Sequence, residues 1–457
     1  MSVDLITFIV FGLFFFLLFA ETPVSFALAA SGGVGIVLLR DADLALSVLG
    51  SVPFSDTHKY SLAIIPMYIL LGMFALHGGL APRVYSAANV LLGRLPGGLG
   101  VATVGACAGF AAVCGSSIAT AASIGKISVH EMMRHGYKAP FAGGIVAIAG
   151  TLGILIPPSV AMVLYGVIAQ ESIAGLLLAG VVPAGIAALA YSLLVVLRAS
   201  KQIVPGRVPL NEALVAAGGK TVPPNDDDGR KITNAQRIRG TGWIAAIFIA
   251  ILVGMFTGLF TVIESAAIGA FMAIVMLVSE NCREGVRAVL RRGKDAILEA
   301  ASVTSMAFAL VVGAGVLSTF LVMARVPMRL TDWVVSIDVP GWVIVAAILL
   351  ILLPLGMFLE TLSILVIVVP LVHPVVTELG YDGIWFGVLF VMMLEIGLVT
   401  PPVGMNTFVV SMASGLRLES VFRGVAPFIA VSLAVVVLIF LFPDFALWLP
   451  ELVGGEG

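Results

Sequence analysis

Apolar runs long enough to cross a lipid bilayer recur along the whole chain and limit what it can fold into. The 457 residues are 60% hydrophobic and only 11% charged, with a mean hydropathy of +1.15, whereas soluble domains carry roughly 25% charged residues. Each membrane-crossing helix needs about 20 apolar residues, and we count roughly ten to thirteen such runs. Because backbone polar groups in lipid must be satisfied within the segment, the sequence predicts an all-α polytopic membrane protein.

Two proline pairs interrupt these apolar runs at corresponding places. The segments read GILIPPSV at Gly153–Val160 and GLVTPPVG at Gly397–Gly404. Proline cannot donate a helix hydrogen bond, and its ring clashes with the carbonyl of the preceding turn. Irregular backbone at membrane depth is tolerated only where it lines a cavity or is buried in protein. The sequence therefore predicts one discontinuous helix at each proline pair, away from lipid.

The least apolar stretch divides the chain into two membrane halves. Residues 198–240 are rich in Pro, Gly, Asn and charge, as is typical of a linker, and hold eight of the 24 Lys and Arg residues. Basic residues mark cytoplasmic loops. We therefore expect a first membrane repeat at residues 1–197, a cytoplasmic linker at 198–240 and a second membrane repeat at 241–457.

The two halves repeat each other with opposite orientation. Residues 136–183 align with residues 380–427 without a gap at an offset of 244, and 10 of the 48 positions are identical, mostly Gly and Pro. The basic segment 281–295 lies two spans after the linker, whereas the corresponding segment 40–59 is poor in basic residues. The halves are thus expected to enter the membrane from opposite faces, as inverted-topology repeats.

Each half also contains an apolar segment with polar or small residues near its middle. These are FAAVCGSSIATAASIG at Phe110–Gly125 and LPLGMFLETLSILVIVVP at Leu353–Pro370. We expect each to form the tip of a re-entrant helical hairpin, with Gly115 or Gly356 at the turn. The offset of 244 pairs the polar residues of the two tips, Ser116 with Glu360 and Ser117 with Thr361.

Matched breaks in inverted repeats point to a transport site. Freed carbonyls can coordinate Na⁺, and freed N–H groups can hold a carboxylate. Glu360 is an ionisable group inside an apolar run. Placing such a group within the membrane costs free energy, so it is taken as a candidate functional residue, and the same holds for Glu395. Glu21 and Glu264 lie near span ends and are weaker candidates, and Arg325 either faces the interior or reaches an interface. The small tip residues serve close helix packing equally well.

The motifs of several other protein classes are missing from the sequence. It contains no GxxxxGK[ST] nucleotide-binding loop and no CxxC pair, and its five histidines lack metal-ligand spacing. Its acidic run, Asp226–Asp228, lies in the linker rather than at a membrane depth where a lipid-modifying enzyme would need it. We therefore predict that the chain is not an enzyme. Its net charge of −2 gives no indication of nucleic-acid binding, so we expect no nucleic-acid partner.

Taken together, these segments resemble the large membrane subunit of tripartite ATP-independent periplasmic (TRAP) transporters. The resemblance covers essentially the whole chain and rests on the sequences GRLPGGLG, GSSIATAASIG, EMMRHGY, GILIPPSVAMVLYG, GMFLE, GLVTPPVGMN and RGVAPF. It implies an importer of the bacterial or archaeal inner membrane that is driven by a Na⁺ gradient and moves its transport domain as an elevator. It also implies two partners, a periplasmic substrate-binding protein and a small four-helix membrane subunit, here expected as a separate chain.

The resemblance also implies roles for residues that match the family motifs. The family usually has Asp where this chain has Glu360. One implied Na⁺ site uses the residues Gly356, Gly397, Thr400 and Val403. The other Na⁺ site uses Gly115, Ser116 and Gly153. A small carboxylate would lie between them, near Ser117, Ser159, Glu360 and Asn406.

The sequence leaves the substrate open among C4-dicarboxylates, sialic or sugar acids and 2-oxo acids. An alternative function is a Na⁺/dicarboxylate or ion carrier that works without a binding protein, because such carriers share hairpins and inverted repeats. A passive channel would not require matched broken helices.

Overall fold

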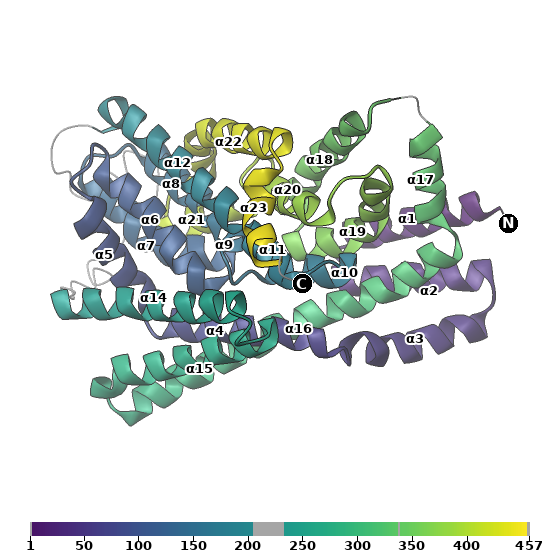
Figure 1. The fold of residues 1–457 in the computed structure, drawn as a ribbon, viewed down its shortest axis with the longest axis horizontal. Helices are drawn as coiled ribbons and strands as arrows, with labels where there is room; N and C mark the ends of the chain where they lie inside the picture. The colour runs from purple at the N-terminus through teal and green to yellow at the C-terminus, as the bar shows by residue number, and fades with distance from the viewer. Residues whose placement is uncertain (1, 204–232, 337–338, 455–457) are drawn as a thin grey trace.

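The computed structural model describes residues 2–203, 233–336 and 339–454, and these residues are almost entirely helical (Figure 1). The linker expected at 198–240 lies largely outside the described residues. In the first half the helices are α1 (Val3–Phe19), α2 (Val24–Leu39), α3 (Ala42–Thr57), η1 (Tyr60–Ala63), α4 (Ile64–His77), α5 (Leu80–Leu92), α6 (Gly98–Cys114), α7 (Ser117–Arg134), α8 (Ala139–Gly150), α9 (Leu152–Leu155), α10 (Val160–Ala169), α11 (Ile173–Ala179) and α12 (Val181–Gln202).

The second half has a related but not identical order of elements. Its helices are α14 (Asn234–Phe256), α15 (Val262–Asn281), η3 (Cys282–Glu284), α16 (Val286–Met323), α17 (Val326–Ser336), α18 (Gly341–Phe358), α19 (Thr361–Glu378), α20 (Gly383–Gly397), α21 (Met405–Ser414), α22 (Leu418–Leu441) and α23 (Asp444–Gly454). At the offset of 244, α7 and α19 coincide from first to last residue. α16 is one 38-residue helix where the first half has α3, η1 and α4.

Many of these helices are long and apolar enough to cross a membrane. Eight helices of the described chain meet that test, or nine if the bent pair α8–α10 counts as one span. Large apolar side chains lie on the outside, such as Phe8, which is 77% exposed, and Phe19, which is 87% exposed. An apolar outer surface of this extent suits contact with lipid. The chain is therefore a multi-pass α-helical membrane protein, as its composition predicts.

Helices from both halves pack side by side in each part of the structure. α16 lies along α2, and α15 lies along α4, in the lower part of Figure 1. α22 lies along α8, where Gly144 and Gly424 meet, and a Cβ on Gly424 would lie only 1.6 Å from the carbonyl oxygen of Pro140. Such close backbone contact is typical of small residues at membrane helix interfaces.

The two hairpins, α6–α7 and α18–α19, have their open ends at opposite ends of α22. Near its start, the His130 ring of α7 hydrogen-bonds the Ser414 carbonyl, with 3.0 Å between Nε2 and the oxygen. Near its end, Trp385 Nε1, just after the second hairpin, donates to the Ile439 carbonyl at 3.0 Å. Twenty-four helical residues span about 36 Å. The hairpin tips therefore approach the middle of the structure from opposite directions.

Candidate functional site

The first break separates α9 from α10, and the helix axis bends by 45° between α8 and α10. Pro157, Pro158 and Ser159 are all buried there, and the Pro157–Pro158 peptide bond is cis. Ser159 is the N-cap of α10, and its hydroxyl accepts a hydrogen bond from the Met162 N–H at 3.2 Å. The proline pair therefore ends one helix, and Ser159 starts the next, inside the protein rather than in lipid.

The tip of the first hairpin packs directly on this break. Gly115 makes the turn after α6 with φ +64°, and Ser116 is the N-cap of α7. A Cβ on Gly115 would lie 2.5 Å from the Pro158 carbonyl oxygen, and one on Gly153 would lie 2.6 Å from the Ser116 carbonyl oxygen. Only glycine permits this approach, which places two backbone carbonyls at the contact between tip and break.

The second hairpin meets the second break through another pair of glycines. A Cβ on Gly397 would lie 2.6 Å from the Gly356 Cα. Gly356 was expected at the hairpin turn, but this expectation is wrong, because Gly356 lies inside α18 and the chain turns at Leu359 and Glu360. Leu359 is the residue that the 244-residue offset pairs with Gly115. The glycine of the second tip is thus used for helix contact rather than for the turn.

The second break is more open than the first. Pro401 and Pro402, also joined by a cis peptide bond, are exposed, and Val403 is 42% exposed. Within the break, the Thr400 hydroxyl donates to the Ile396 carbonyl at 2.6 Å, and the Asn406 N–H donates to the Leu398 carbonyl at 3.0 Å. These two bonds close the loop between α20 and α21.

Asn406 is the most unusual polar residue near the second break. Its side chain is fully buried, and neither its amide nitrogen nor its amide oxygen has a hydrogen-bond partner among the residues that the structure describes. Leaving a buried polar group unpaired costs about 1–3 kcal/mol. An amide held in this way is suited to bind a polar ligand.

Glu395 connects the two hairpin tips. It lies in the last turn of α20 and is 2% exposed. The Thr361 hydroxyl, at the start of α19, donates to Glu395 Oε1 at 3.3 Å, and the Ser117 hydroxyl, at the start of α7, interacts with the same carboxyl group. The sequence marks Glu395 as an ionisable group in an apolar run but does not place it among the site residues. Its position between the two tips depends on tertiary packing.

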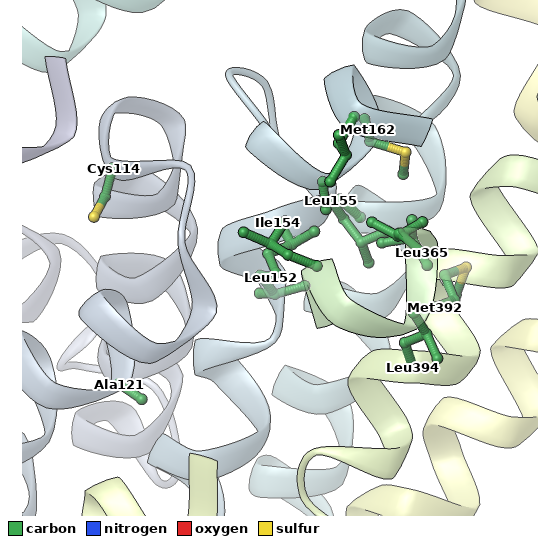
Figure 2. Packing of buried hydrophobic residues seen from close by; sticks show 14 of the residues in the cluster. Cys114, Ala121, Leu152, Ile154, Leu155, Met162, Leu365, Met392 and Leu394 are labelled. Carbon is green, nitrogen blue, oxygen red and sulfur yellow. The ribbon is translucent and has the colours of Figure 1, made fainter. Parts of the chain in front are cut away.

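The apolar surroundings of the site come from both halves. Figure 2 shows Leu152, Ile154 and Leu155 of α9 near Leu365 of α19 and Leu394 of α20, all of them buried. These side chains keep the region between the breaks at low polarity, which strengthens electrostatic interactions there.

Three weaker candidates lie away from this region. Glu264 forms a capping box with Thr261, whose N–H donates to the Glu264 carboxylate at 2.8 Å, and therefore starts α15. Glu21 is exposed, in the turn between α1 and α2. Arg325 is exposed after the end of α16, so it does not face the interior.

Backbone carbonyl oxygens lie at both contacts between a hairpin tip and a broken helix. The oxygens of Ser116 and Pro158 lie at the first contact, and a Cβ on Gly356 would lie 2.9 Å from the Leu394 oxygen at the second. Oxygen ligands suit hard cations, and unwound carbonyls in paired repeats are typical ligands of transported Na⁺. Two hairpins with paired broken helices thus define a class of secondary membrane transporter.

Comparison with known proteins gives the family. Residues 11–445 match the family model described as the tripartite ATP-independent periplasmic transporter, DctM component. The chain is 33% identical over 433 residues to the C4-dicarboxylate TRAP transporter large permease protein DctM of Pseudomonas aeruginosa. The aligned region covers 94% of each chain. It is 32% identical to the isethionate TRAP transporter permease protein DctMQ of Oleidesulfovibrio alaskensis, covering 94% of this chain and 64% of that relative.

The fold is also similar to a solved structure, the Alcanivorax borkumensis YdaH transporter. The TM-score is 0.63 at 14% sequence identity, with 89% of this chain and 90% of that chain covered. The protein belongs to the DctM component family of tripartite ATP-independent periplasmic transporters. This membership confirms the resemblance noted from the sequence and the expectation of a transport protein rather than an enzyme.

Proposed function

We propose that the chain is the large membrane subunit of a Na⁺-coupled importer of small organic acids. The observation that carries the proposal is the packing of each hairpin tip against a broken helix. Ser116 and Pro158 carbonyls lie at the first contact, and Gly356 meets Gly397 at the second. Na⁺ would bind at the residues Gly115, Ser116 and Gly153 in the first half and at Gly356, Gly397, Thr400 and Val403 in the second.

The substrate carboxylate would bind between these two positions. Asn406 offers an unpaired amide, and Ser117 and Ser159 each stand at the start of a helix, where N–H groups favour an anion. Glu360, the N-cap of α19 in the second tip, is half-buried. Relatives named for C4-dicarboxylates, isethionate, sialic acid and 2,3-diketo-L-gulonate all handle small organic acids or their anions.

The energetics favour accumulation. Moving one net positive charge inward across 100 mV provides about 2.3 kcal/mol. Two Na⁺ ions with one monocarboxylate carry one net positive charge, and each tenfold accumulation requires about 1.4 kcal/mol. The membrane potential alone then supports more than a tenfold accumulation, before the Na⁺ gradient is counted.

Two partners belong to this proposal. The family name describes one component of a tripartite system, which fits a periplasmic substrate-binding protein and a small four-helix membrane subunit. The chain spans 64% of the relative DctMQ, so that longer relative has room for a second membrane component. We place the complex in the bacterial or archaeal inner membrane, with an elevator-like movement of the hairpin region against α2, α4, α15 and α16.

Uptake by proteoliposomes tests the proposal. The chain is reconstituted with its small subunit, and uptake of labelled succinate, N-acetylneuraminate and pyruvate is measured with an inward Na⁺ gradient, with and without the binding protein. Uptake that needs both Na⁺ and the binding protein is the expected result. Na⁺-driven uptake without the binding protein would favour the alternative carrier, and Na⁺-independent uptake would overturn the coupling.

A further inference from the structure

The start of α16 lies on the same side of the membrane as the linker, here called the linker side. α14 follows the linker, and α14 and α15 are each long enough to cross the membrane. Arg239, near the start of α14, pairs with Glu280, near the end of α15, with 3.2 Å between Nη2 and Oε2. The chain has therefore crossed twice and returned to the linker side before α16 begins.

α16 is longer than a membrane crossing requires. Its 38 residues extend about 57 Å, whereas the hydrocarbon core of a bilayer is about 30 Å thick. Residues 300–323 contain no charged side chain and are long enough by themselves to cross that core. Residues 286–299, which precede them, therefore lie at the lipid headgroups or beyond them on the linker side.

This first part of α16 carries a row of basic side chains without partners in the described chain. Arg287, Arg291 and Lys294 recur at the spacing i, i+4 and i+7, which places them on one face of the helix. All three are exposed, and their side chains form no hydrogen bond or ion pair within the described residues. These three residues are called the basic face.

Arg292 shows what a structural arginine of the same helix does. Its guanidinium donates to Asn281 Oδ1 at 2.7 Å and to Glu284 Oε2 at 2.6 Å, which ties α16 to the turn that precedes it. The basic face makes no such contact. Arg287 also lies in the first turn, where a positive charge opposes the helix dipole. The charges of the basic face therefore suit an anion from outside the chain.

Apolar side chains border the basic face. Val286, Leu290 and Ile297 are exposed, Leu290 to 66%, and they lie on the adjoining stripe of the helix. Basic and apolar side chains on neighbouring stripes are typical of helices at the boundary between lipid headgroups and acyl chains. An anion bound here thus belongs to a molecule that also offers apolar surface.

We propose that the basic face binds the phosphate groups of anionic lipids in the leaflet on the linker side. Lys294 and Arg291 precede residue 300 by about 9 and 14 Å along the helix axis. The headgroup layer is about 5–8 Å deep on each side of the core, and its negative potential extends about 8–10 Å further. Both side chains lie within that reach, and long basic side chains extend toward charged groups while their methylenes stay on apolar surface.

Energy transfer from a fluorophore on Cys282 tests the proposal at the site itself. Cys282 is exposed just before α16, whereas Cys107 and Cys114 are buried, so the label reports on the start of the helix. The full chain, with a cysteine-free small subunit, is titrated in detergent with phosphatidylglycerol or phosphatidylcholine, each carrying the same acceptor on an acyl chain. Energy transfer should saturate at a lower concentration of phosphatidylglycerol.

The test variant combines Arg291→Gln with Lys294→Gln. Each basic residue near an anionic surface strengthens binding about fivefold, so the double variant should bind phosphatidylglycerol about 25-fold more weakly and phosphatidylcholine unchanged. Both side chains are exposed, and thermal unfolding checks that the variant is folded. Arg287→Gln alone, with an expected loss of about fivefold, is the second test if the double variant does not fold.

The matched control removes two basic residues at the far end of α16. α2 meets α16 there, because a Cβ on Gly35 would lie 2.5 Å from the Phe320 ring. Arg40 and Arg325 each follow five residues later, and both are exposed. Arg40→Gln combined with Arg325→Gln should leave the energy transfer at Cys282 unchanged.

Four results would overturn the proposal. Equal affinity for the two lipids, or equal losses in the test and control variants, would remove the basic face as an anionic-lipid site. Displacement of phosphatidylglycerol by an equal concentration of inorganic phosphate would assign the face to a soluble anion. Loss of the small subunit from the purified test variant would assign it to that partner. A failure of Na⁺-driven uptake would not affect this measurement, so the two proposals fail separately.

Discussion

Replacing Gly153 by alanine tests whether the contact between the first tip and the first break controls Na⁺ binding. The added Cβ would lie 2.6 Å from the Ser116 carbonyl oxygen and 3.0 Å from the Ser117 Cα. Ordinary contact begins near 3.4 Å, so the tip must move by about 0.8 Å away from the break. The three nearest atoms, the third being the Ser116 carbonyl carbon at 2.8 Å, all belong to the backbone, which cannot rotate away as a flexible side chain would.

Overpacking of this kind costs about 1–3 kcal/mol. If the cost falls on the packed state of the tip, the Na⁺ affinity falls by about 5- to 150-fold. Alanine also favours a helix over glycine by about 0.5–1 kcal/mol, which acts in the opposite direction. Gly185→Ala in α12 is the matched control, because nothing lies within 4 Å of its added Cβ.

The assay measures uptake against Na⁺ concentration in proteoliposomes that contain the small subunit. Thermal unfolding of the same preparations reports whether each variant is folded. Gly153→Ala should shift the half-saturating Na⁺ concentration upward, and Gly185→Ala should leave it unchanged. A folded Gly153→Ala protein with wild-type Na⁺ dependence would refute the reasoning that the tip–break contact forms part of a cation site.

Three further predictions follow from the same structure. Glu360→Ala and Thr400→Val should each abolish Na⁺-driven uptake without unfolding the protein, as seen by uptake and thermal unfolding; wild-type uptake in either would contradict its assigned role. Replacing external Na⁺ with choline should collapse uptake, and persistence under a proton gradient alone would indicate proton coupling. Glu280→Ala should destabilise the fold by about 3–5 kcal/mol, because it removes a buried ion pair with Arg83 at 2.8 Å; unchanged thermal unfolding would show that the pair contributes nothing.

The positions of the breaks and hairpins could be predicted because they depend on local chemistry. Pro157 and Pro401 remove a backbone donor wherever they stand, so each ends its helix. The offset that aligns the prolines also predicts the bounds of α19 from those of α7. The number of spans is harder to predict, since α18 and α19 are each long enough to cross a membrane although they meet at a hairpin tip.

Other features required the three-dimensional arrangement. Gly356 and Gly115 are both glycines in an apolar segment with polar residues close behind. Gly356 nevertheless packs against α20, whereas Gly115 makes the turn after α6. Val403 and Ser159 follow equivalent proline pairs, but Val403 is exposed and Ser159 is buried. The sequence around a residue does not record which neighbours cover it.

The sequence by itself determined that this chain is a multi-pass helical membrane protein with two broken helices. Both signals are local: an apolar run of sufficient length can cross the membrane, and a proline interrupts the helix in which it lies because it lacks a backbone N–H. Only the tertiary structure decided that Ser117 and Thr361 converge on Glu395, and that one break is buried while the other is open. Those contacts join residues 34 to 278 positions apart, and their geometry depends on how whole helices pack.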